Sequence, residues 1–199
     1  MRDEPRFSSH GARHLPGVRA ALGGAEGWVV DFGCGEGIFA DVSAKWVGLD
    51  RDARWSAGLA AVGRPALTAD IHHVPLRDGS AGGVLCMNVL QGVRDPEGVL
   101  REILRVLRAG GRAYLKNRWH KGGGDPRGSW ERLRKAFHLH HLRFWSHPWG
   151  HPEGAVATEM NPDGTRAICP RCVRRFFERR GCAVERVSPQ VFVVTRNGI

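Results

Sequence analysis

VVDFGCGEGIFA, residues Val29–Ala40, joins an apolar run to an acid and then to a loop with three alternating glycines. The apolar residues on both sides of Asp31 are typical of a buried strand. Gly33, Gly35 and Gly37 allow backbone conformations that a Cβ would block, and they let a ligand approach closely. The stretch therefore predicts a strand, a sharp turn and a ligand site at the carboxyl end of the strand, where open α/β sheets bind ligands.

The spacing of these glycines differs from that of two common nucleotide-binding loops. Ile38 stands where a dinucleotide-binding loop has its third glycine, and Glu36-Gly37-Ile38 is not the Gly-Lys-Ser/Thr of a phosphate loop. An acid at position 31 would repel a pyrophosphate and would suit a cationic amine. A glycine turn without a function remains the alternative.

Two further acids follow short apolar segments. Asp50 ends the segment Trp46–Asp50 and lies 17 residues after Gly33, a spacing that suits an acceptor for ribose hydroxyls. Asp70 follows the apolar segment Pro65–Thr68. A simple turn acid at position 50 and an ordinary loop acid at position 70 are the alternatives.

The next apolar strand, Gly83–Val89, leads to a predicted helix. Asp95 suits the N-cap, Pro96 the first helical position, and Glu97 the positive end of the helix dipole. One apolar face follows, made by Leu100, Ile103, Leu104 and Leu107. Gly110-Gly111 then stops the helix before a further strand at Arg112–Leu115.

With these motifs in place, the chain resembles class I S-adenosylmethionine-dependent methyltransferases, in the branch of the ubiquinone/menaquinone-type enzymes. The resemblance covers Gly27–Asn117 and resumes at Pro170–Arg196, and it is carried by VVDFGCGEG and by Asn88–Leu115. It implies an α/β fold with a Rossmann-like, seven-stranded, mostly parallel sheet, flanking helices, an antiparallel last strand and a helical or loop lid insertion. Because this fold serves many acceptors, the resemblance does not name the substrate.

The resemblance also implies roles for single residues toward S-adenosylmethionine, with S-adenosylhomocysteine as the product. Asp31 would hold the amino-acid part, the glycine loop would line the methionine and ribose, and Asp50 would accept the ribose hydroxyls. Asp70 and Ile71 would face the adenine with Arg51 beside it, while Asn88 and Val89 would close over the methyl group. The expected cofactor residues are Asp31, Gly33, Cys34, Gly35, Gly37, Asp50, Arg51, Asp70, Ile71, Asn88 and Val89. A strand-end cap is the alternative role for Asn88.

The chain divides into four expected parts. Residues 1–26 would form a cap helix around Leu15–Leu22 over the cofactor mouth, and residues 27–118 the cofactor-binding core. Residues 119–168 would form the lid, and residues 169–199 the last helix and hairpin. The expected helices of the core are 36–44, 53–61, 96–108 and 170–180, and the expected strands are 28–32, 46–50, 65–68, 83–89, 111–117, 182–188 and 191–196.

The insertion 119–168 is rich in aromatic residues and histidines. Trp119, Trp130, His141, Trp145 and Trp149 are candidates for an aromatic wall around a flat or cationic acceptor, and a hydrophobic cluster that holds a lid is the alternative. His120 is the candidate general base, needed only if the acceptor carries a proton. The stretch 151–164 is expected to be a loop because it is rich in proline and glycine.

A zinc site is a second hypothesis for the histidines of the insertion. His147 and His151 precede Cys169 and Cys172, and these are the ligand types and local spacings of a tetrahedral zinc site. Histidines without a ligand and buried thiols are the alternative.

The 199 residues carry 30 Lys+Arg against 20 Asp+Glu, a net charge of +10. Arginines gather at 171, 174, 175, 179 and 180, which favours either a solvated basic face or a patch for RNA. Five cysteines without a secretory signal favour reduced thiols in a cytoplasm, and no apolar run has membrane-spanning length. We therefore expect methyl transfer to a small molecule by in-line displacement. The alternative is an RNA-directed methyltransferase or a basic RNA-binding module that uses the arginine-rich helix near the C-terminus; the sequence does not indicate the oligomeric state.

Overall fold

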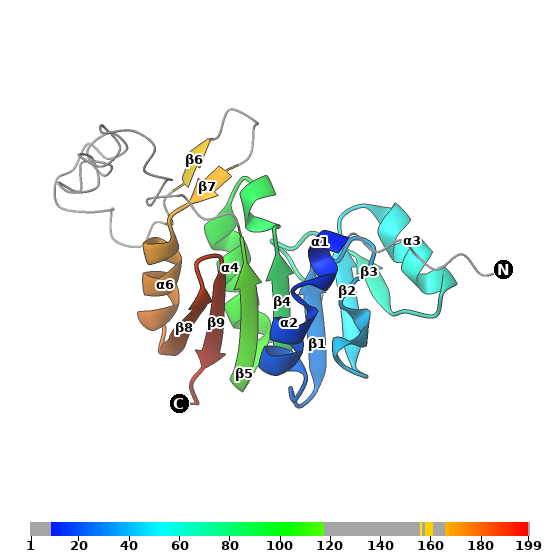
Figure 1. Ribbon diagram of the computed structural model, residues 1–199, viewed down its shortest axis with the longest axis horizontal. Helices are drawn as coiled ribbons and strands as arrows, with labels where there is room; N and C mark the ends of the chain where they lie inside the picture. The colour runs from blue at the N-terminus through cyan, green and yellow to red at the C-terminus, as the bar shows by residue number, and fades with distance from the viewer. Residues whose placement is uncertain (1–8, 118–155, 157, 161–165, 199) are drawn as a thin grey trace.

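The computed structural model describes residues 9–117, 156, 158–160 and 166–198. Seven strands form one sheet in the order β3-β2-β1-β4-β5-β9-β8, as Figure 1 shows. The strands are β1 Trp28–Phe32, β2 Trp46–Asp50, β3 Ala66–Thr68, β4 Ala81–Met87, β5 Leu107–Lys116, β8 Cys182–Ser188 and β9 Val191–Arg196. The helices are α1 Ser9–Ala12, α2 Leu15–Leu22, α3 Ala53–Ala61, α4 Pro96–Val106 and α6 Pro170–Glu178, with 3-10 turns η1 Ala40–Val42 and η2 Leu90–Gly92.

The direction of the strands confirms the expected fold class. β1 to β5 pair in parallel, whereas β9 is antiparallel to both of its neighbours, β5 and β8. The carboxyl ends of the parallel strands therefore meet at one edge of the sheet. Most strands and helices begin and end within a few residues of their predicted limits.

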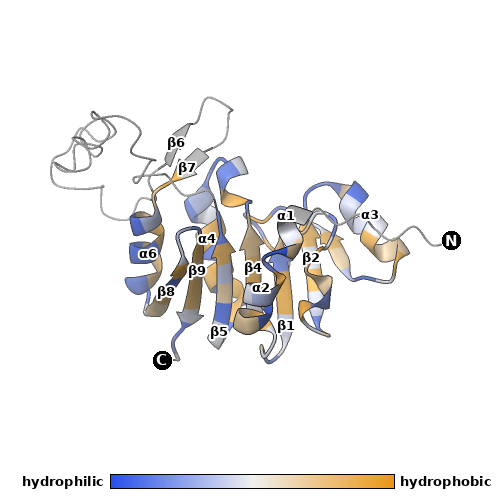
Figure 2. Cartoon of the chain, viewed as in Figure 1, coloured by the Kyte–Doolittle hydropathy of each residue, from blue (hydrophilic) through white to orange (hydrophobic). Residues whose placement is uncertain are grey.

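Two apolar clusters sandwich the sheet. Side chains from alternate positions of the strands pack with α4 and α6 on one face, with Leu100, Ile103 and Phe177 fully buried. The opposite positions pack with α2, η1 and α3, where Val18 and Leu22 of α2 are fully buried. Figure 2 shows the apolar strands of the sheet and the polar outer side of α6. Among the described residues, no helix is long and apolar enough to cross a membrane.

The predicted helix at 36–44 is wrong. The chain makes turns after β1 and forms only the short η1 before β2. Gly33, Gly35 and Gly37 all have positive φ angles of 71°, 49° and 71°. A right-handed helix does not continue through a residue in the left-handed region, and Gly37 lies within the predicted range, so only η1 forms before β2.

The N-terminal helices also differ from the expectation. α2 forms at Leu15–Leu22 as predicted, but it lies on the face of the sheet against β4 and β5 rather than over the mouth of the site. The helix beside the glycine loop is α1, where Gly11 packs closely on Ile38.

The end of the insertion contains a hairpin where we expected a loop. β6 Thr158–Met160 and β7 Arg166–Ile168 pair in antiparallel fashion, and β7 contacts η2. The backbone N–H of Val156 donates to Glu97 Oε2 at 3.0 Å, which ties this segment to the first turn of α4.

A network around Arg105 fixes the loop between β3 and β4. Its guanidinium donates to the carbonyls of Val74 and Leu76 at 2.8 Å each and forms ion pairs with Glu102 and Asp78. Glu102 in turn accepts from the backbone N–H of Val74 at 2.8 Å. These contacts explain why the pKa of Glu102 lies below its ordinary value, mainly through its hydrogen bond with Arg105.

We predict that Arg105→Ala lowers the free energy of unfolding by about 1–3 kcal/mol, because two part-buried carbonyls and Glu102 each lose a charged donor. The matched control is Arg101→Ala, which removes an exposed ion pair with Glu97 on the same helix and is expected to cost about 0.5 kcal/mol or less. Urea denaturation followed by circular dichroism measures both variants. Equal losses in the two would contradict this role of Arg105.

Candidate cofactor site

The candidate site lies at the carboxyl ends of β1, β2, β4 and β5. Asp31 of β1 pairs in register with Gly48 of β2, and Asp50 lies two residues further along β2 on the same side of the sheet. The strand pairing thus brings together the two acids that the sequence analysis placed at the site.

Asp50 is fixed to the glycine loop by hydrogen bonds. Its Oδ2 accepts from the backbone N–H of Gly35 at 3.1 Å, and its Oδ1 accepts from the backbone N–H of Asp52 at 3.0 Å. Gly35 has a φ of 49°, and a Cβ built there would meet no atom within 4 Å. The loop therefore presents open space beside a carboxylate that is already held in one orientation.

Gly33 brings the end of β4 against this loop. A Cβ at Gly33 would lie 2.5 Å from Cγ2 of Val89, so only glycine permits the contact. The backbone N–H groups of Gly33 and Cys34 both donate to the carbonyl of Leu49, at 2.7 and 3.0 Å. The three strand ends of the site are thus joined by backbone contacts as well as by side chains.

Asp31 is a buried acid, with only 3% of its surface exposed. Burial raises the pKa of its carboxyl from 3.8 to about 7; the Trp46 side chain opposes part of this shift, and the charge of Asp50 adds to it. Its Oδ2 atom is buried, and the described residues supply it with no hydrogen bond. A buried acceptor of this kind fits a ligand that brings its own cationic donor.

The residues around Asp31 include two that the sequence analysis missed. Gly48 lacks a side chain where the Trp46 ring and the Cys34 thiol pack, because a Cβ there would lie 2.6 Å from Trp46 Cη2 and 2.5 Å from Cys34 Sγ. Burial and the two nearby acids raise the pKa of Cys34 to about 12, so the thiol stays neutral and packs as a wall residue. No motif in the sequence indicated this role for Trp46 or Gly48.

Asp70 lies in the loop after β3 and is exposed, with His72 as its partner. Its Oδ1 accepts from the backbone N–H of His72 at 2.9 Å and contacts His72 Nδ1 at 2.8 Å, and these bonds lower the pKa of Asp70. His72 Nε2 lies 3.1 Å from the carbonyl of Asp95, so His72 links the loop after β3 with the start of α4. Ile71 is buried in the main core, whereas Arg51 is exposed next to Asp50.

Asn88 follows β4 and has a polar neighbour that the sequence analysis also missed. Its Oδ1 accepts from Nζ of Lys116 at 2.7 Å, and its backbone N–H donates to the carbonyl of Lys116 at the same distance. Lys116 and the following Asn117 are buried at the end of β5. A charged residue at the end of an apolar strand was the available signal for Lys116.

The remaining candidates fall into two groups. His120, Trp119, Trp130, His141, Trp145, Trp149, His147 and His151 lie outside the described residues. Cys169 immediately precedes α6, and Cys172 is buried inside that helix. The described residues contain no group of three or more metal-ligating side chains, so the zinc hypothesis gains no support here.

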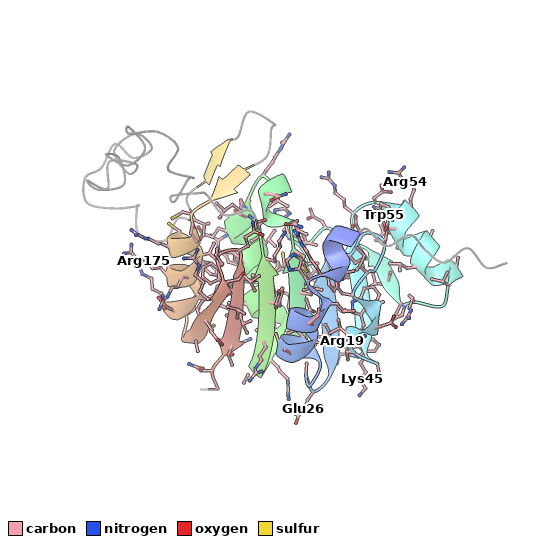
Figure 3. All side chains as sticks on the ribbon, viewed as in Figure 1. Arg19, Glu26, Lys45, Arg54, Trp55 and Arg175 are labelled. Atoms are coloured by element: carbon pink, nitrogen blue, oxygen red, sulfur yellow. The ribbon has the colours of Figure 1, made fainter. Side chains whose placement is uncertain are left out.

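The five arginines of and after α6 are all exposed, and Arg175 points away from the sheet in Figure 3. Arg174 pairs with Glu178 at 2.6 Å, and the Arg180 guanidinium lies 3.9 Å from the centre of the Phe176 ring. Part of this basic surface thus serves the stability of the helix itself.

The comparison with protein families assigns the core. The family described as "Methyltransferase domain" matches residues 30–115, which span the glycine loop, both acids and the end of β5. Residues 30–115 therefore match a methyltransferase domain. This finding agrees with the class I S-adenosylmethionine-dependent methyltransferase fold, and it does not extend to the ubiquinone/menaquinone branch.

Individual relatives share the domain over part of their length. Two proteins from Mycobacterium sp., strains KMS and MCS, each named "Uncharacterized methyltransferase", are 40% identical over 93 residues. The match covers 44% of this chain and 37% of each relative. The chain thus matches well under half the length of these relatives.

Solved structures share the fold at low sequence identity. Geranyl diphosphate methyltransferase in complex with SAM is 14% identical, with a TM-score of 0.61 over 94% of this chain and 85% of that chain. The [4+2]-cyclase SpnF is 19% identical, with a TM-score of 0.63 over 88% of this chain and 59% of that chain. The second likeness is to a protein named for a different reaction, so the chemistry must be argued from the site.

The raised pKa of Asp31 predicts how stability depends on pH. A carboxyl whose pKa rises on folding stabilises the folded state most at pH values below its unfolded pKa of 3.8. This stabilisation is lost as the pH rises through the folded pKa of about 7. Without ligand, we expect Asp31→Asn to melt at a higher temperature than the wild type at pH 8, with a smaller difference at pH 5.

Thermal denaturation between pH 5 and 8 measures this difference. Asp41→Asn is the control because it removes an exposed carboxylate outside the site. A difference between Asp31→Asn and wild type that does not change with pH would contradict the buried, protonated carboxyl.

Proposed function

We propose that this protein transfers a methyl group from S-adenosylmethionine to a small-molecule acceptor. The observation that carries the proposal is the pair of acids at the ends of β1 and β2, one buried with an unsatisfied oxygen and one held by Gly35. The matching methyltransferase domain supports the same cofactor. When bound, S-adenosylmethionine supplies an activated methyl group on a positively charged sulfur.

Different residues of the site bind different parts of this cofactor. Asp31, once ionised, accepts from the amine of the methionine part, and Asp50 accepts from the ribose hydroxyls. The open side of Gly35 leaves room for the ribose between them. Asp70 accepts from the exocyclic amine of adenine, with Arg51 beside the ring. Each acid thus accepts a hydrogen bond from a different part of the cofactor. These non-covalent contacts together position the methyl group.

Methyl transfer then depends mainly on alignment and on exclusion of water. An in-line displacement needs the acceptor on the side of the methyl group opposite the sulfur. The strand order β2-β1-β4-β5 leaves the ends of β4 and β5 for the acceptor, since β2 and β1 carry the residues for the cofactor. The insertion begins after β5 and returns at Val156 beside α4, so it is joined to the core on the acceptor side.

The proposed acceptor is a small molecule. A single compact domain with an aromatic insertion favours an enclosed pocket for a small molecule. RNA is the alternative because of the arginines of α6, and its binding would weaken steeply with salt. A cytoplasmic location belongs to the same proposal.

We predict that wild-type protein binds S-adenosylmethionine in isothermal titration calorimetry and that Asp50→Ala weakens this binding roughly 5- to 150-fold. The loss corresponds to about 1–3 kcal/mol, as expected when a fixed acceptor for two hydroxyls is removed. Asp41→Ala is the control, because this acid pairs with Arg64 away from the site, and it is expected to bind like the wild type. Equal affinity in Asp50→Ala would contradict the ribose assignment.

The acceptor is tested by transfer of a labelled methyl group from S-adenosylmethionine into a fractionated extract of the organism that encodes the chain. Label in the small-molecule fraction is the expected result. Label in RNA or protein would overturn the small-molecule proposal, and the same assay with Asp31→Asn and Asp50→Ala would show whether the label depends on this site.

A further inference from the structure

Buried polar residues are rare in the described part of the chain, and they gather at one edge of the sheet. Asp31, Lys116 and Asn117 are the polar or charged residues buried there, at the carboxyl ends of β1 and β5. Burial of a charge is unfavourable unless other groups compensate it. The proposed function accounts for Asp31, but it leaves the buried lysine at the end of β5 without a role.

Lys116 holds the residue that follows β4. It pairs in register with Met87, which places it beside Asn88. The ammonium donates to the side-chain oxygen of Asn88 and the carbonyl of Lys116 accepts from the Asn88 backbone N–H, both at 2.7 Å. Asn88 is therefore bound through its side chain and its backbone by the same residue.

The backbone of Asn88 needs such support. With a φ of 56°, it is the non-glycine residue with a positive φ among those described. Asparagine tolerates this left-handed conformation better than most residues, but a strained conformation persists only where its surroundings enforce it. The Lys116 contacts and the packing of the next residue, Val89, on Gly33 supply this constraint.

The place of this pair in the sheet gives it a relation to the reaction. Asp50 and Asp31 lie at the ends of β2 and β1, and Asn88 and Lys116 lie at the ends of the next two strands in the sheet order, β4 and β5. With the ribose at β2 and the amine at β1, the acceptor side of the site is the side of β4 and β5. This step rests on the proposed function.

We propose that Lys116 is a positioning residue that fixes Asn88 and places a positive charge at the acceptor side of the site. During transfer the bond from sulfur to the methyl carbon breaks, and its electron pair stays on sulfur. The new bond forms from a lone pair of the acceptor, so the sulfur changes from a cation to a neutral thioether. The acceptor gains the unit of positive charge that the sulfur loses, so an anionic acceptor becomes neutral. An ammonium fixed on the acceptor side attracts such an anion and raises the free energy of the charged cofactor relative to its neutral product, and it thus favours transfer to an anionic acceptor.

The test compares the affinities of the charged cofactor and the neutral product. Dissociation constants for S-adenosylmethionine and S-adenosylhomocysteine are measured by calorimetry on the wild type, Lys116→Met, Lys116→Gln and Lys116→Arg. In the two neutral variants, we expect the ratio of affinities to shift toward S-adenosylmethionine by about three- to tenfold. Lys116→Arg keeps the charge and should keep the wild-type ratio.

The ratio of the two affinities distinguishes the effect of the charge from a general structural effect, because a distorted site weakens the binding of both ligands in a similar way. Lys116→Gln keeps a donor for Asn88, so it tests the charge even if the apolar Lys116→Met variant does not fold. Arg101→Ala is the matched control, because it removes a positive charge from the exposed side of α4 outside the site, and its ratio should remain within about twofold of the wild type.

The possible results distinguish this inference from the function on which it rests. If the wild type binds neither ligand, the proposed function fails. If the wild type binds both ligands and the neutral variants keep its ratio within about twofold, the role of Lys116 is overturned while the cofactor assignment stands. A shift of equal size in Lys116→Arg would also overturn it, since the charge is retained there.

Discussion

The hydrogen bond from the Gly35 backbone to the Asp50 carboxylate is the interaction on which the site depends. It joins the loop after β1 to the end of β2, two strands that are parallel and in register. Parallel pairing aligns the strand ends, and this bond acts together with the backbone bonds from Gly33 and Cys34 to Leu49 to hold the loop at the end of β2. The left-handed glycines and the contact between Gly33 and Val89 then extend the arrangement to the end of β4.

The buried acid and the buried lysine of the described chain lie at this same edge of the sheet. Asp31 is buried, and its pKa is raised to about 7, while Lys116 is buried two strands away in the sheet order. Apart from these two residues and Asn117, the buried residues of the described chain are apolar. At the opposite edge of the sheet, a cavity of about 280 Å³ lies beside the exposed Arg64–Asp41 pair.

The fold could be predicted largely because its signals are local. The alternation of apolar segments with glycines, the cap at Asp95 and the final hairpin each depend on a few neighbouring residues, and all of these elements form. The predicted helix at 36–44 did not form: Gly37 within this range has a positive φ, and only the short η1 follows it. The hairpin β6–β7 was missed because its strands are only three residues long.

By itself, the sequence determined the acids, the glycine spacing and hence the kind of ligand that the site suits. The tertiary structure decided which residues meet there. Trp46 fills the space over Gly48 because the strand alternation puts them on one face, and Lys116 reaches Asn88 because β4 and β5 are neighbours although 28 residues separate the two positions. Burial and its effect on the pKa of Asp31 likewise arise only from packing, since a carboxylate in the extended chain is solvated and a folded core removes that water.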